Sequence, residues 1–249
     1  MIRFDLTYKP FGETAILIEW PERIDPDIIQ DINSFDQVLR KYQKVKETIV
    51  AYNSILVKLS SYQNYSLHYK HKNDFDRFTD HFRKLYGQER DIKLSRRKLW
   101  EIPVCYDLEF GIDLEELSQA KNISVSKIVE LHTEPDYLIY FLGFQPGFMY
   151  LGGLNELLHT PRRVNPRLRI SKGAVGIGGQ QTGIYPQDSS GGWNIIGNSP
   201  LDFFNPTKKN PCFFCAGESV RFTSIDIKEY HKILNRLSDG TYQPKFSWL

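Results

Sequence analysis

The pattern of hydrophobic and polar positions predicts two strands and a helix at the start of the chain. Residues 2–8 (IRFDLTY) and 14–20 (TAILIEW) are rich in β-forming residues, and residues 9–12 between them are typical of a turn. Asp25 can cap a helix that has Pro26 at its first position. Hydrophobic residues then recur at steps of three and four, which predicts one apolar stripe: Ile28, Ile29, Ile32, Phe35, Val38, Leu39 and Tyr42.

Two more strands and a second helix complete the first part. Residues 46–52 (KETIVAY) and 54–60 (SILVKLS) are strand candidates joined by a turn at Asn53. Asn73 or Asp74 can cap a helix that ends near Gly87. Its apolar face holds Phe75, Phe78, Phe82 and Leu85. The order ββαββα predicts an α+β domain, with both helices on one face of a small antiparallel sheet.

Glycine placement divides the chain into two parts. Of the 17 glycines, 12 lie between Gly143 and Gly197, whereas the first 100 residues hold only Gly12 and Gly87. This shift predicts two domains of different architecture, residues 1–92 and 93–249, with a polar, basic linker over residues 88–98.

The second part is predicted to be mainly β-structure. KLWEIPVCY begins it, and two short helices follow Asp113 and Ser124, the second ending near Pro135. The strand-like segments YLIYFLGF, AVGIGG, WNIIG and SVRFTSI are separated by Gly and Pro turns, which predicts a β-barrel or sandwich. A helix from Asp226 to Leu237 closes this domain, and the last residues are predicted to be a tail.

Composition excludes several classes of protein. The 249 residues are 41% hydrophobic and 25% charged, which is typical of a globular chain and not of a disordered one. Lys and Arg number 32 against 30 Asp and Glu, so the net charge of +2 does not favour nucleic-acid binding. Apolar runs are too short to span a membrane, and the start lacks the pattern of a secretory signal. Three cysteines fit a reducing cytoplasm.

Familiar catalytic and cofactor motifs are absent from the sequence. It contains neither a P-loop, nor a G-x-S-x-G elbow, nor H-E-x-x-H, and Gln181 breaks the dinucleotide pattern that begins at Gly176. Cys212 and Cys215 form a lone C-x-x-C. Because a zinc site needs four ligands, we expect these cysteines to be small apolar residues of a strand, and no metal site is predicted.

A basic block without acidic residues runs from Leu157 to Gln187. Its cations are Arg162, Arg163, Arg167, Arg169 and Lys172, with His159 beside them. Guanidinium groups bind carboxylate and phosphate bidentately, and the glycines that follow could bring backbone N–H groups close to an anion. Charge alone fits a small-anion site and an interface with an acidic partner equally well. Nucleic acid is less favoured, because aromatic residues do not interleave with these cations.

Two other features have both a structural and a functional interpretation. His132 ends a predicted helix, where its charge would favour the helix dipole, and its ordinary pKa near ~6.5 also suits acid–base work. Residues 143–151 (GFQPGFMYL) predict a hairpin with a Pro-Gly turn. Its aromatic side chains would fill a barrel core or form the wall of a pocket or interface.

Three segments resemble the signature blocks of one family: FLGFQPGFMYLGGL, TPRRVNPRLRI and GGQQTGIYPQDSSGGWNIIGNSP. That family includes the B subunit of bacterial 5-oxoprolinase, a sporulation-kinase inhibitor and the part of urea carboxylase that is similar to allophanate hydrolase subunit 1. CYDLEFGIDLEEL, KIVELHTEPDYLIYFLGF and AGESVRF extend the resemblance over nearly the whole chain.

The resemblance implies a fold and an activity. The fold is an α+β N-terminal domain followed by a cyclophilin-like, mostly antiparallel β-barrel. The activity is that of one part of a hydrolase, inactive alone. With the C subunit, a barrel protein similar to allophanate hydrolase subunit 2, and with the separate A subunit, it opens 5-oxo-L-proline to L-glutamate, with ATP and Mg²⁺ as co-substrate. The alternatives are an inhibitor that docks on a sensor histidine kinase and a partner in carboxyl transfer of the urea and allophanate type.

The resemblance also assigns roles to residues. Arg162, Arg163 and Arg167 match the block P-R-R-x-x-P-R and are expected to bind substrate or nucleotide anions. The same role is implied for residues in two further blocks: Gln181, Thr182, Gly183, Tyr185, Ser190, Gly191, Gly192 and Trp193. His132 matches a leucine–histidine pair and is the catalytic candidate.

An aromatic wall and two departures from the family pattern complete the prediction. Four residues are expected to line a pocket completed by the C subunit, or to form the interface with it: Phe144, Pro146, Phe148 and Tyr150. Ser190 stands where the family usually has proline, and Asn198 where an arginine often follows the glycine. The second departure removes a cation from this end of the predicted site.

Overall fold

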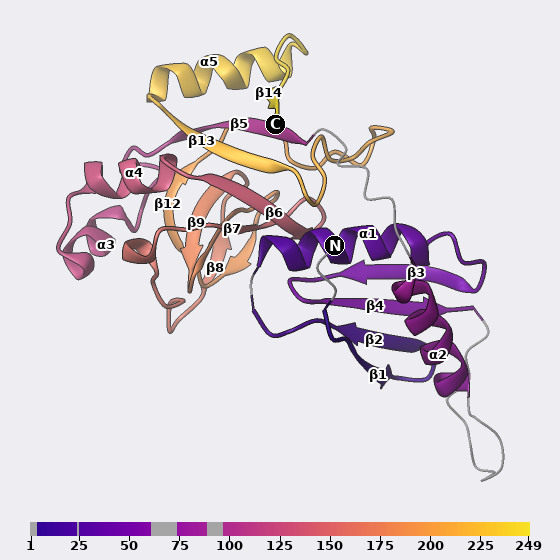
Figure 1. Cartoon of the computed structure of the whole chain (residues 1–249). Helices are drawn as coiled ribbons and strands as arrows, with labels where there is room; N and C mark the ends of the chain where they lie inside the picture. The colour runs from indigo at the N-terminus through magenta and orange to yellow at the C-terminus, as the bar shows by residue number, and fades with distance from the viewer. Residues whose placement is uncertain (1–3, 24, 61–73, 89–96) are drawn as a thin grey trace. The chain divides into compact units, whose positions relative to one another are not determined.

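The computed structural model of the chain describes residues 4–23, 25–60, 74–88 and 97–249 (Figure 1). By their internal contacts, the residues form two compact units, Met1–Ser95 and Arg96–Leu249. The predicted boundary after residue 92, most of the predicted linker and the predicted cap Asn73 lie outside the described residues.

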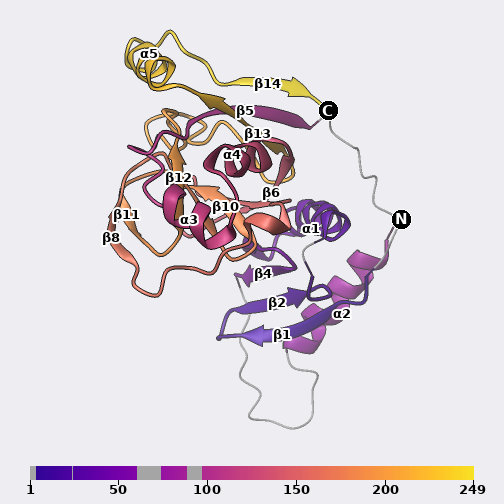
Figure 2. The same ribbon diagram turned by 90° about the vertical axis from the view of Figure 1, so that its left-hand side faces the viewer.

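The first unit has the predicted order of elements. Its strands and helices are β1 (Thr7–Phe11), β2 (Ala15–Glu19), α1 (Pro26–Leu39), β3 (Val45–Val50), β4 (Ser54–Leu59) and α2 (Asp74–Gly87). The strands form one antiparallel sheet in the order β1-β2-β4-β3 (Figure 1), and Figure 2 shows β1, β2 and β4 from the side. Asp25 caps α1 as predicted, because its side chain accepts a hydrogen bond from the backbone N–H of Asp27.

The first turn lies later in the chain than predicted. Lys9, Pro10 and Phe11 belong to β1, and the turn begins at Gly12 instead. Pro10 is tolerated because β1 is an edge strand that pairs with β2 alone, so the missing backbone N–H breaks no second ladder. Tyr42 also lies beyond the end of α1, which stops at Leu39.

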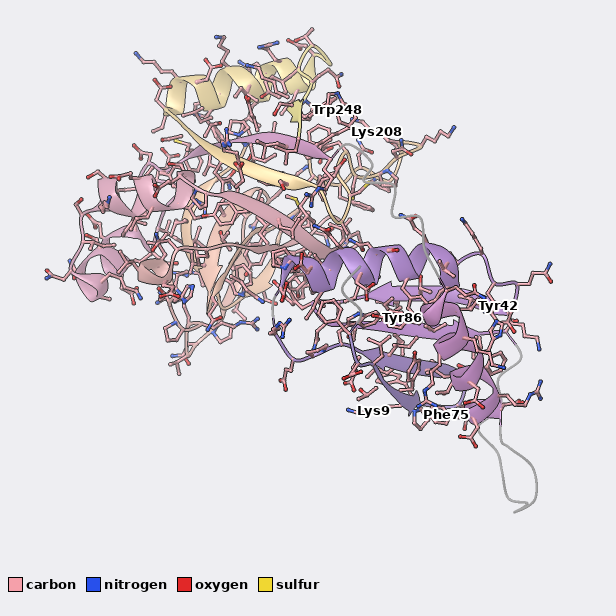
Figure 3. All side chains as sticks on the ribbon, viewed as in Figure 1. Lys9, Tyr42, Phe75, Tyr86, Lys208 and Trp248 are labelled. Carbon is pink, nitrogen blue, oxygen red and sulfur yellow. The ribbon has the colours of Figure 1, made fainter. Side chains whose placement is uncertain are left out.

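A buried carboxylate joins the helices of the first unit. Asp31 of α1 is 4% exposed, and its Oδ2 accepts hydrogen bonds from the Trp20 indole at 2.8 Å and the Tyr86 hydroxyl at 2.5 Å. The Phe35 ring packs edge-on against Tyr86 of α2, at 5.1 Å between centroids. Tyr86 is labelled in Figure 3. Both helices therefore share this buried polar anchor.

The second unit begins with β5 and contains most of the strands. Its elements are β5 (Lys98–Cys105), α3 (Leu114–Lys121), α4 (Val125–Thr133), β6 (Asp136–Leu142), β7 (Met149–Gly152), a 3₁₀ turn (Glu156–Leu158), β8 (Arg167–Ile170), β9 (Ala174–Gly178), β10 (Gln181–Ile184), β11 (Ser189–Gly191), β12 (Asn194–Asn198), β13 (Ser219–Ile225), α5 (Ile227–Ser238) and β14 (Lys245–Trp248). The helices predicted after Asp113 and Ser124 are α3 and α4, and the predicted closing helix is α5.

Seven strands close into a mixed barrel. They follow the order β12-β9-β10-β7-β6-β13-β5, and pairing of Asn198 with Cys105 joins β12 back to β5. Every pair in this ring is antiparallel except β5–β13, which is parallel over residues 99–105 and 219–225. The predicted barrel is confirmed, and the parallel pair between distant segments is a feature that the pattern of turns did not predict.

The prediction that the last residues form a tail is wrong. Residues Lys245–Trp248 form β14, which pairs antiparallel with the first half of β5 outside the ring (Figure 1). The ammonium group of Lys98 lies 4.6 Å from the Phe246 ring centroid and 4.9 Å from that of Trp100. A free stretch of β5 and this cation–π contact give the segment its strand conformation.

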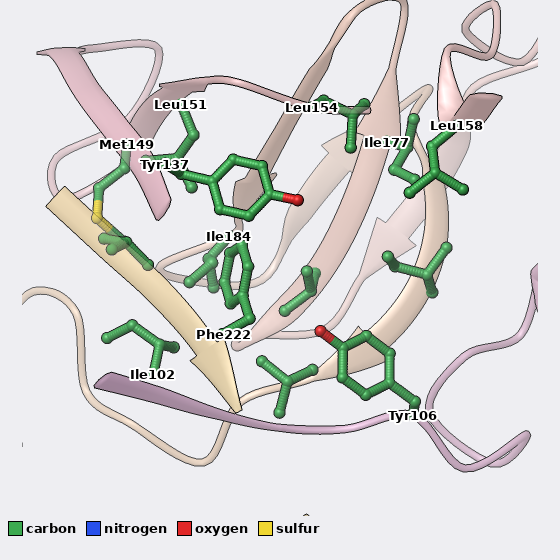
Figure 4. Close-up of a cluster of buried hydrophobic side chains, with 14 of the residues drawn as sticks. Ile102, Tyr106, Tyr137, Met149, Leu151, Leu154, Leu158, Ile177, Ile184 and Phe222 are labelled. Atoms are coloured by element: carbon green, nitrogen blue, oxygen red, sulfur yellow. The ribbon is translucent and has the colours of Figure 1, made fainter. Parts of the chain in front are cut away.

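The barrel interior is the main core of the second unit (Figure 4). Along β7 and β9 side chains alternate, so that Met149, Leu151, Val175 and Ile177 face this core. Helix α4 carries Ile128 into the same core. Within the described residues, no helix has the length and apolar character that crossing a membrane requires.

The C-x-x-C segment does not lie in a strand. Cys212 is half-buried and Cys215 exposed, both in a loop that ends before β13 begins at Ser219. Phe214 between them is buried, and Phe213 packs edge-on against Trp100 at 4.9 Å. The aromatic pair anchors this loop, and burial raises the pKa of the half-buried Cys212 thiol.

Candidate functional site

A buried aspartate neutralises two arginines of the basic block. Asp113, just before α3, is 1% exposed. Its carboxylate accepts two hydrogen bonds from Arg167, one at 2.8 Å and one at 2.5 Å, and one from Arg163 at 3.0 Å. It also accepts a hydrogen bond from the backbone N–H of Ile195 at 2.6 Å. Glu116, one turn into α3, makes a second ion pair with Arg163. The predicted anion ligands Arg163 and Arg167 therefore already hold an internal carboxylate.

Two further cations of the block have acidic partners as well. Arg169 pairs with Asp188 at 2.8 Å, and Lys172 with Asp202 at 2.7 Å. The block is free of acids along the chain, but the fold brings acids to it from α3, from the loop before β11 and from beyond β12. Four of the five cations of the block therefore have an acidic partner within this chain, and the anion-binding role of Arg163 and Arg167 stays a prediction.

Arg162 differs from the other four cations. It is exposed, and within the described residues it makes no ion pair. Its guanidinium lies over the indole ring of Trp193, 5.9 Å from the ring centroid. The guanidinium hydrogen bonds run along its edge, so stacking on an aromatic face leaves its donors available to a ligand.

Trp193 belongs to an aromatic cluster outside the barrel wall. The cluster contains Phe148, Ile170, Ala174, Tyr185, Trp193 and Ile195, with Tyr150 packed against it. Phe148 is its centre, because its ring meets Tyr150, Tyr185 and Trp193 edge-on at 5.0–5.7 Å. These residues alternate in sequence with those that face the barrel interior, so the two cores share the wall formed by β7, β9, β10 and β12.

Glycines in the wall make room for the Trp193 ring. A Cβ atom at Gly178 would lie 2.5 Å from the indole nitrogen, and one at Gly183 would lie 3.1 Å from the six-membered ring. The glycine-rich run was predicted to bring backbone N–H groups to an anion. In the structure, Gly176, Gly178 and Gly183 have an aromatic residue against them instead.

The hairpin between β6 and β7 places an aromatic residue at the surface. Phe144 is 64% exposed, and its φ of 59° is in the left-handed region, which disfavours a bulky side chain. Its ring meets Phe148 edge-on at 5.5 Å. Gly147 supplies the positive φ that the turn after Pro146 needs. Phe148 is thus a core residue, whereas Phe144 and Pro146 are exposed as a wall or interface requires.

His132 reaches the barrel interior. It is fully buried, and its ring stacks on Phe222 at 4.5 Å. The Thr182 hydroxyl donates to the Gly176 carbonyl and therefore accepts from Nε2 of His132 at 2.8 Å, so Nδ1 accepts from the Tyr106 hydroxyl at 2.7 Å. Burial lowers the pKa of His132 to about 3, which keeps the ring neutral. The catalytic role stays a prediction, whereas the contacts give His132 and Thr182 a structural one.

The other predicted residues surround the cluster or lie away from it. Tyr185 is buried, and its hydroxyl is close to the position that a Cβ at Gly191 would take. Ser190 is exposed and Gln181 half-buried, both on short strands. Asn198 is buried and fully hydrogen-bonded. Its side-chain N–H donates a hydrogen bond to the Lys172 carbonyl, and its side-chain oxygen accepts one from the Tyr230 hydroxyl. The departure at position 198 therefore places a structural link in the barrel wall.

Asp113 is a member of the site that the sequence did not reveal. It was predicted to precede a helix, but its carboxylate makes no capping hydrogen bond to α3. One signal was available. The sequence has an aspartate before a predicted helix and an arginine-rich loop about 50 residues later. These residues form an ion pair only if the fold brings them together, and a single sequence does not show whether it does.

Comparison with known proteins gives this arrangement a family. Residues 6–214 match the family model described as carboxyltransferase domain, subdomain C and D. The chain is 35% identical over 231 residues to the B subunit of 5-oxoprolinase from Bacillus subtilis (strain 168), covering 90% of this chain and 94% of that one. It is 38% identical over 213 residues to the same subunit of Escherichia coli O157:H7, covering 85% and 92%. The chain belongs to the family of 5-oxoprolinase B subunits.

Solved structures show the same fold within longer chains. The structure of TTHA0988 has a TM-score of 0.69 and 29% identity over 85% of this chain, which spans 40% of that protein's length. The urea amidolyase of K. lactis has a TM-score of 0.77 over 98% of this chain, at 15% identity, and this chain spans 16% of it. Family members thus share the fold of a unit that larger proteins also contain.

Proposed function

We propose that the chain is the B subunit of an ATP-dependent 5-oxoprolinase, which acts in the cytoplasm with the A and C subunits to convert 5-oxo-L-proline to L-glutamate. The observation that carries this proposal is the identity of 35–38% to B subunits of 5-oxoprolinase, over at least 85% of this chain. Alone, the chain is expected to be inactive. Its relation to part of a longer chain, as in TTHA0988, supports a partner that completes the site.

In this proposal, the surface around Trp193 is this chain's side of the active site. Arg162 contacts the substrate, and the exposed ring of Phe144 forms the wall or the interface with the C subunit. The buried residues Phe148, Thr182, Gly183 and Tyr185 act by shaping the wall beneath them. Gln181, Ser190, Gly191 and Gly192 flank the same surface and remain proposed contacts.

The basic block does not fit the triphosphate of ATP. A triphosphate with Mg²⁺ is bound by several cations or by a nest of backbone N–H groups. Here Arg163 and Arg167 hold Asp113, and Arg169 and Lys172 hold Asp188 and Asp202. In this proposal, ATP and Mg²⁺ bind the assembled enzyme away from these four paired cations.

Reconstitution tests the proposed function. This chain would be mixed with the A and C subunits, ATP, Mg²⁺ and 5-oxo-L-proline, and glutamate would be measured with each protein omitted in turn. Glutamate that requires all three proteins is expected. A well-assembled complex that forms no glutamate would contradict the proposal.

The family model's description favours one second candidate, a partner in carboxyl transfer. This function would need a biotin-carrying carboxylase, so it predicts carboxylation of urea that avidin inhibits. Assays of the same complex with and without an added biotin-carrying carboxylase, urea and bicarbonate separate the two functions. Glutamate formation unaffected by avidin supports the hydrolase, whereas avidin-sensitive carboxylation supports carboxyl transfer.

A further inference from the structure

The backbone on both sides of Arg162 is held in place. The carbonyl of Pro161 accepts a hydrogen bond from the Asn194 side chain at 3.0 Å, and the backbone N–H of Arg163 donates to the Gly192 carbonyl at 2.7 Å. Thr160 makes a two-way backbone bridge with Gly179. These contacts join the segment to β9, to β12 and to the turn that leads into Trp193, so Arg162 starts from a rigid backbone.

Neighbouring ion pairs hold the following residues equally firmly. Asp113 holds Arg163 and Arg167, whose side chains are each 26% exposed. Arg162 therefore projects from a segment that is fixed before and after it, while its own side chain has no acidic partner within the described residues. A positioned but unpaired guanidinium is an arrangement that a bound anion would complete.

The surroundings of Arg162 limit the charge of that anion. The site offers one unpaired positive charge, above the ring of Trp193, among the residues that the structure describes. Burial raises the pKa of Tyr150 and Tyr185 and the positive charge of Arg162 opposes this effect, so both phenols lie in its field and stay neutral at pH 7. One fork of unpaired donors matches a single carboxylate. It does not match a polyphosphate, which carries several negative charges.

We propose that Arg162, stacked on Trp193, is the receptor for the carboxylate of the substrate, and that it selects cyclic amides bearing one carboxylate over those without it. This inference rests on the proposed function, because it assigns the substrate and not the nucleotide to this surface. The guanidinium binds the carboxylate through the donors along its edge.

The test uses two substrates that differ only in the carboxylate. The assembled enzyme would be assayed with 5-oxo-L-proline and with 2-pyrrolidone, the same lactam without the carboxylate. In Arg162→Gln, kcat/KM for 5-oxo-L-proline should fall by about 10- to 150-fold, the range for a lost charge-assisted hydrogen bond. Its kcat/KM for 2-pyrrolidone and its KM for ATP should not change. Arg162→Lys should recover part of the loss, because it keeps the charge without the fork.

A matched control uses another exposed arginine of the block. Arg169→Gln removes a side chain that is 81% exposed and paired with Asp188, and it should leave all three constants unchanged. An increase in the KM for ATP in Arg162→Gln, or an equal loss with both lactams, would overturn the proposal. Melting curves of the variants show that each chain is folded.

Direct binding separates this inference from the proposed function. Titration calorimetry of the complex of this chain with the C subunit measures binding of 5-oxo-L-proline whether or not turnover occurs. If the wild-type complex is inactive but binds 5-oxo-L-proline through Arg162, the proposed function fails and the carboxylate site stands. Equal binding by wild type and Arg162→Gln, or an absence of binding, refutes the carboxylate site.

Discussion

Replacing Asp113 with alanine tests the interpretation that one buried carboxylate organises the surface around Trp193. Four hydrogen bonds end on this carboxylate: two from Arg167, one from Arg163 and one from the backbone N–H of Ile195. The variant would leave two guanidinium groups and one buried N–H without their acceptor. Because these groups come from β8, β12 and the loop that carries Arg162, the loss affects all three.

The magnitude follows from the burial of each group. Removing one partner of a buried ion pair costs about 3–5 kcal/mol, and an unbonded buried N–H costs about 1–3 kcal/mol. The guanidinium groups are 26% exposed, so they regain part of their hydration, and Arg163 keeps Glu116. We therefore expect a loss of about 3–4 kcal/mol. For a chain of this length, that lowers Tm by roughly 6–16 °C.

The assay is thermal unfolding followed by tryptophan fluorescence, because three of the four tryptophans, Trp100, Trp193 and Trp248, lie in the second unit. Glu116→Gln is the control, since Glu116 pairs with the same Arg163 but is 68% exposed. It should shift the free energy of unfolding by less than about 1 kcal/mol. A Tm for Asp113→Ala within roughly 2 °C of that of the control would refute the reasoning.

Two further predictions concern the barrel wall and its interior. Gly178→Ala places a methyl group 2.5 Å from the Trp193 indole nitrogen, so it should lower the free energy of unfolding by about 1–3 kcal/mol and shift the tryptophan emission. Gly192→Ala is the control, because its added methyl group meets its nearest atom at 3.5 Å, and it should melt near the wild-type temperature. Equal melting of the two variants would contradict the account of the glycines. His132, with its pKa lowered to about 3 by burial, is neutral in the folded chain but protonates near pH ~6.5 when unfolded, so the unfolded state binds more protons below that pH. Wild type should thus lose up to about 1.4 kcal/mol of stability per pH unit between pH ~6.5 and ~5, and His132→Gln should lose less. Melting curves at several pH values check this, and parallel slopes for the two proteins would contradict a buried neutral ring.

Local sequence signals determined most of the elements. Asp25 and Pro26 start α1, Ser124 starts α4, and the periodic apolar residues of both helices are largely buried as predicted. Such signals are reliable because capping, as at both helices, and amphipathic burial, as predicted for α1, depend on residues within one or two turns. The order of strands and helices in the first unit followed from the same reasoning.

Pairings between distant segments were decided by the tertiary structure. The parallel pair β5–β13 joins residues that lie far apart in sequence, at 99–105 and 219–225, and β14 became a strand because β5 had a free stretch beside it. No local pattern at residues 245–248 records that partner, so this segment was predicted to be a tail. A strand's hydrogen bonds are made with another segment, unlike those of a helix.

The site shows the same division most clearly. The sequence determined that arginines gather in one short block and identified Trp193 and its glycines as part of a motif. The tertiary structure determined that Asp113 neutralises Arg163 and Arg167 and that Arg162 alone of the block's five cations has no acidic partner among the described residues. The charge pattern along the sequence shows only which charged residues are neighbours in the chain. A ligand interacts with the charge that is left after the fold has formed ion pairs between residues that are neighbours in space.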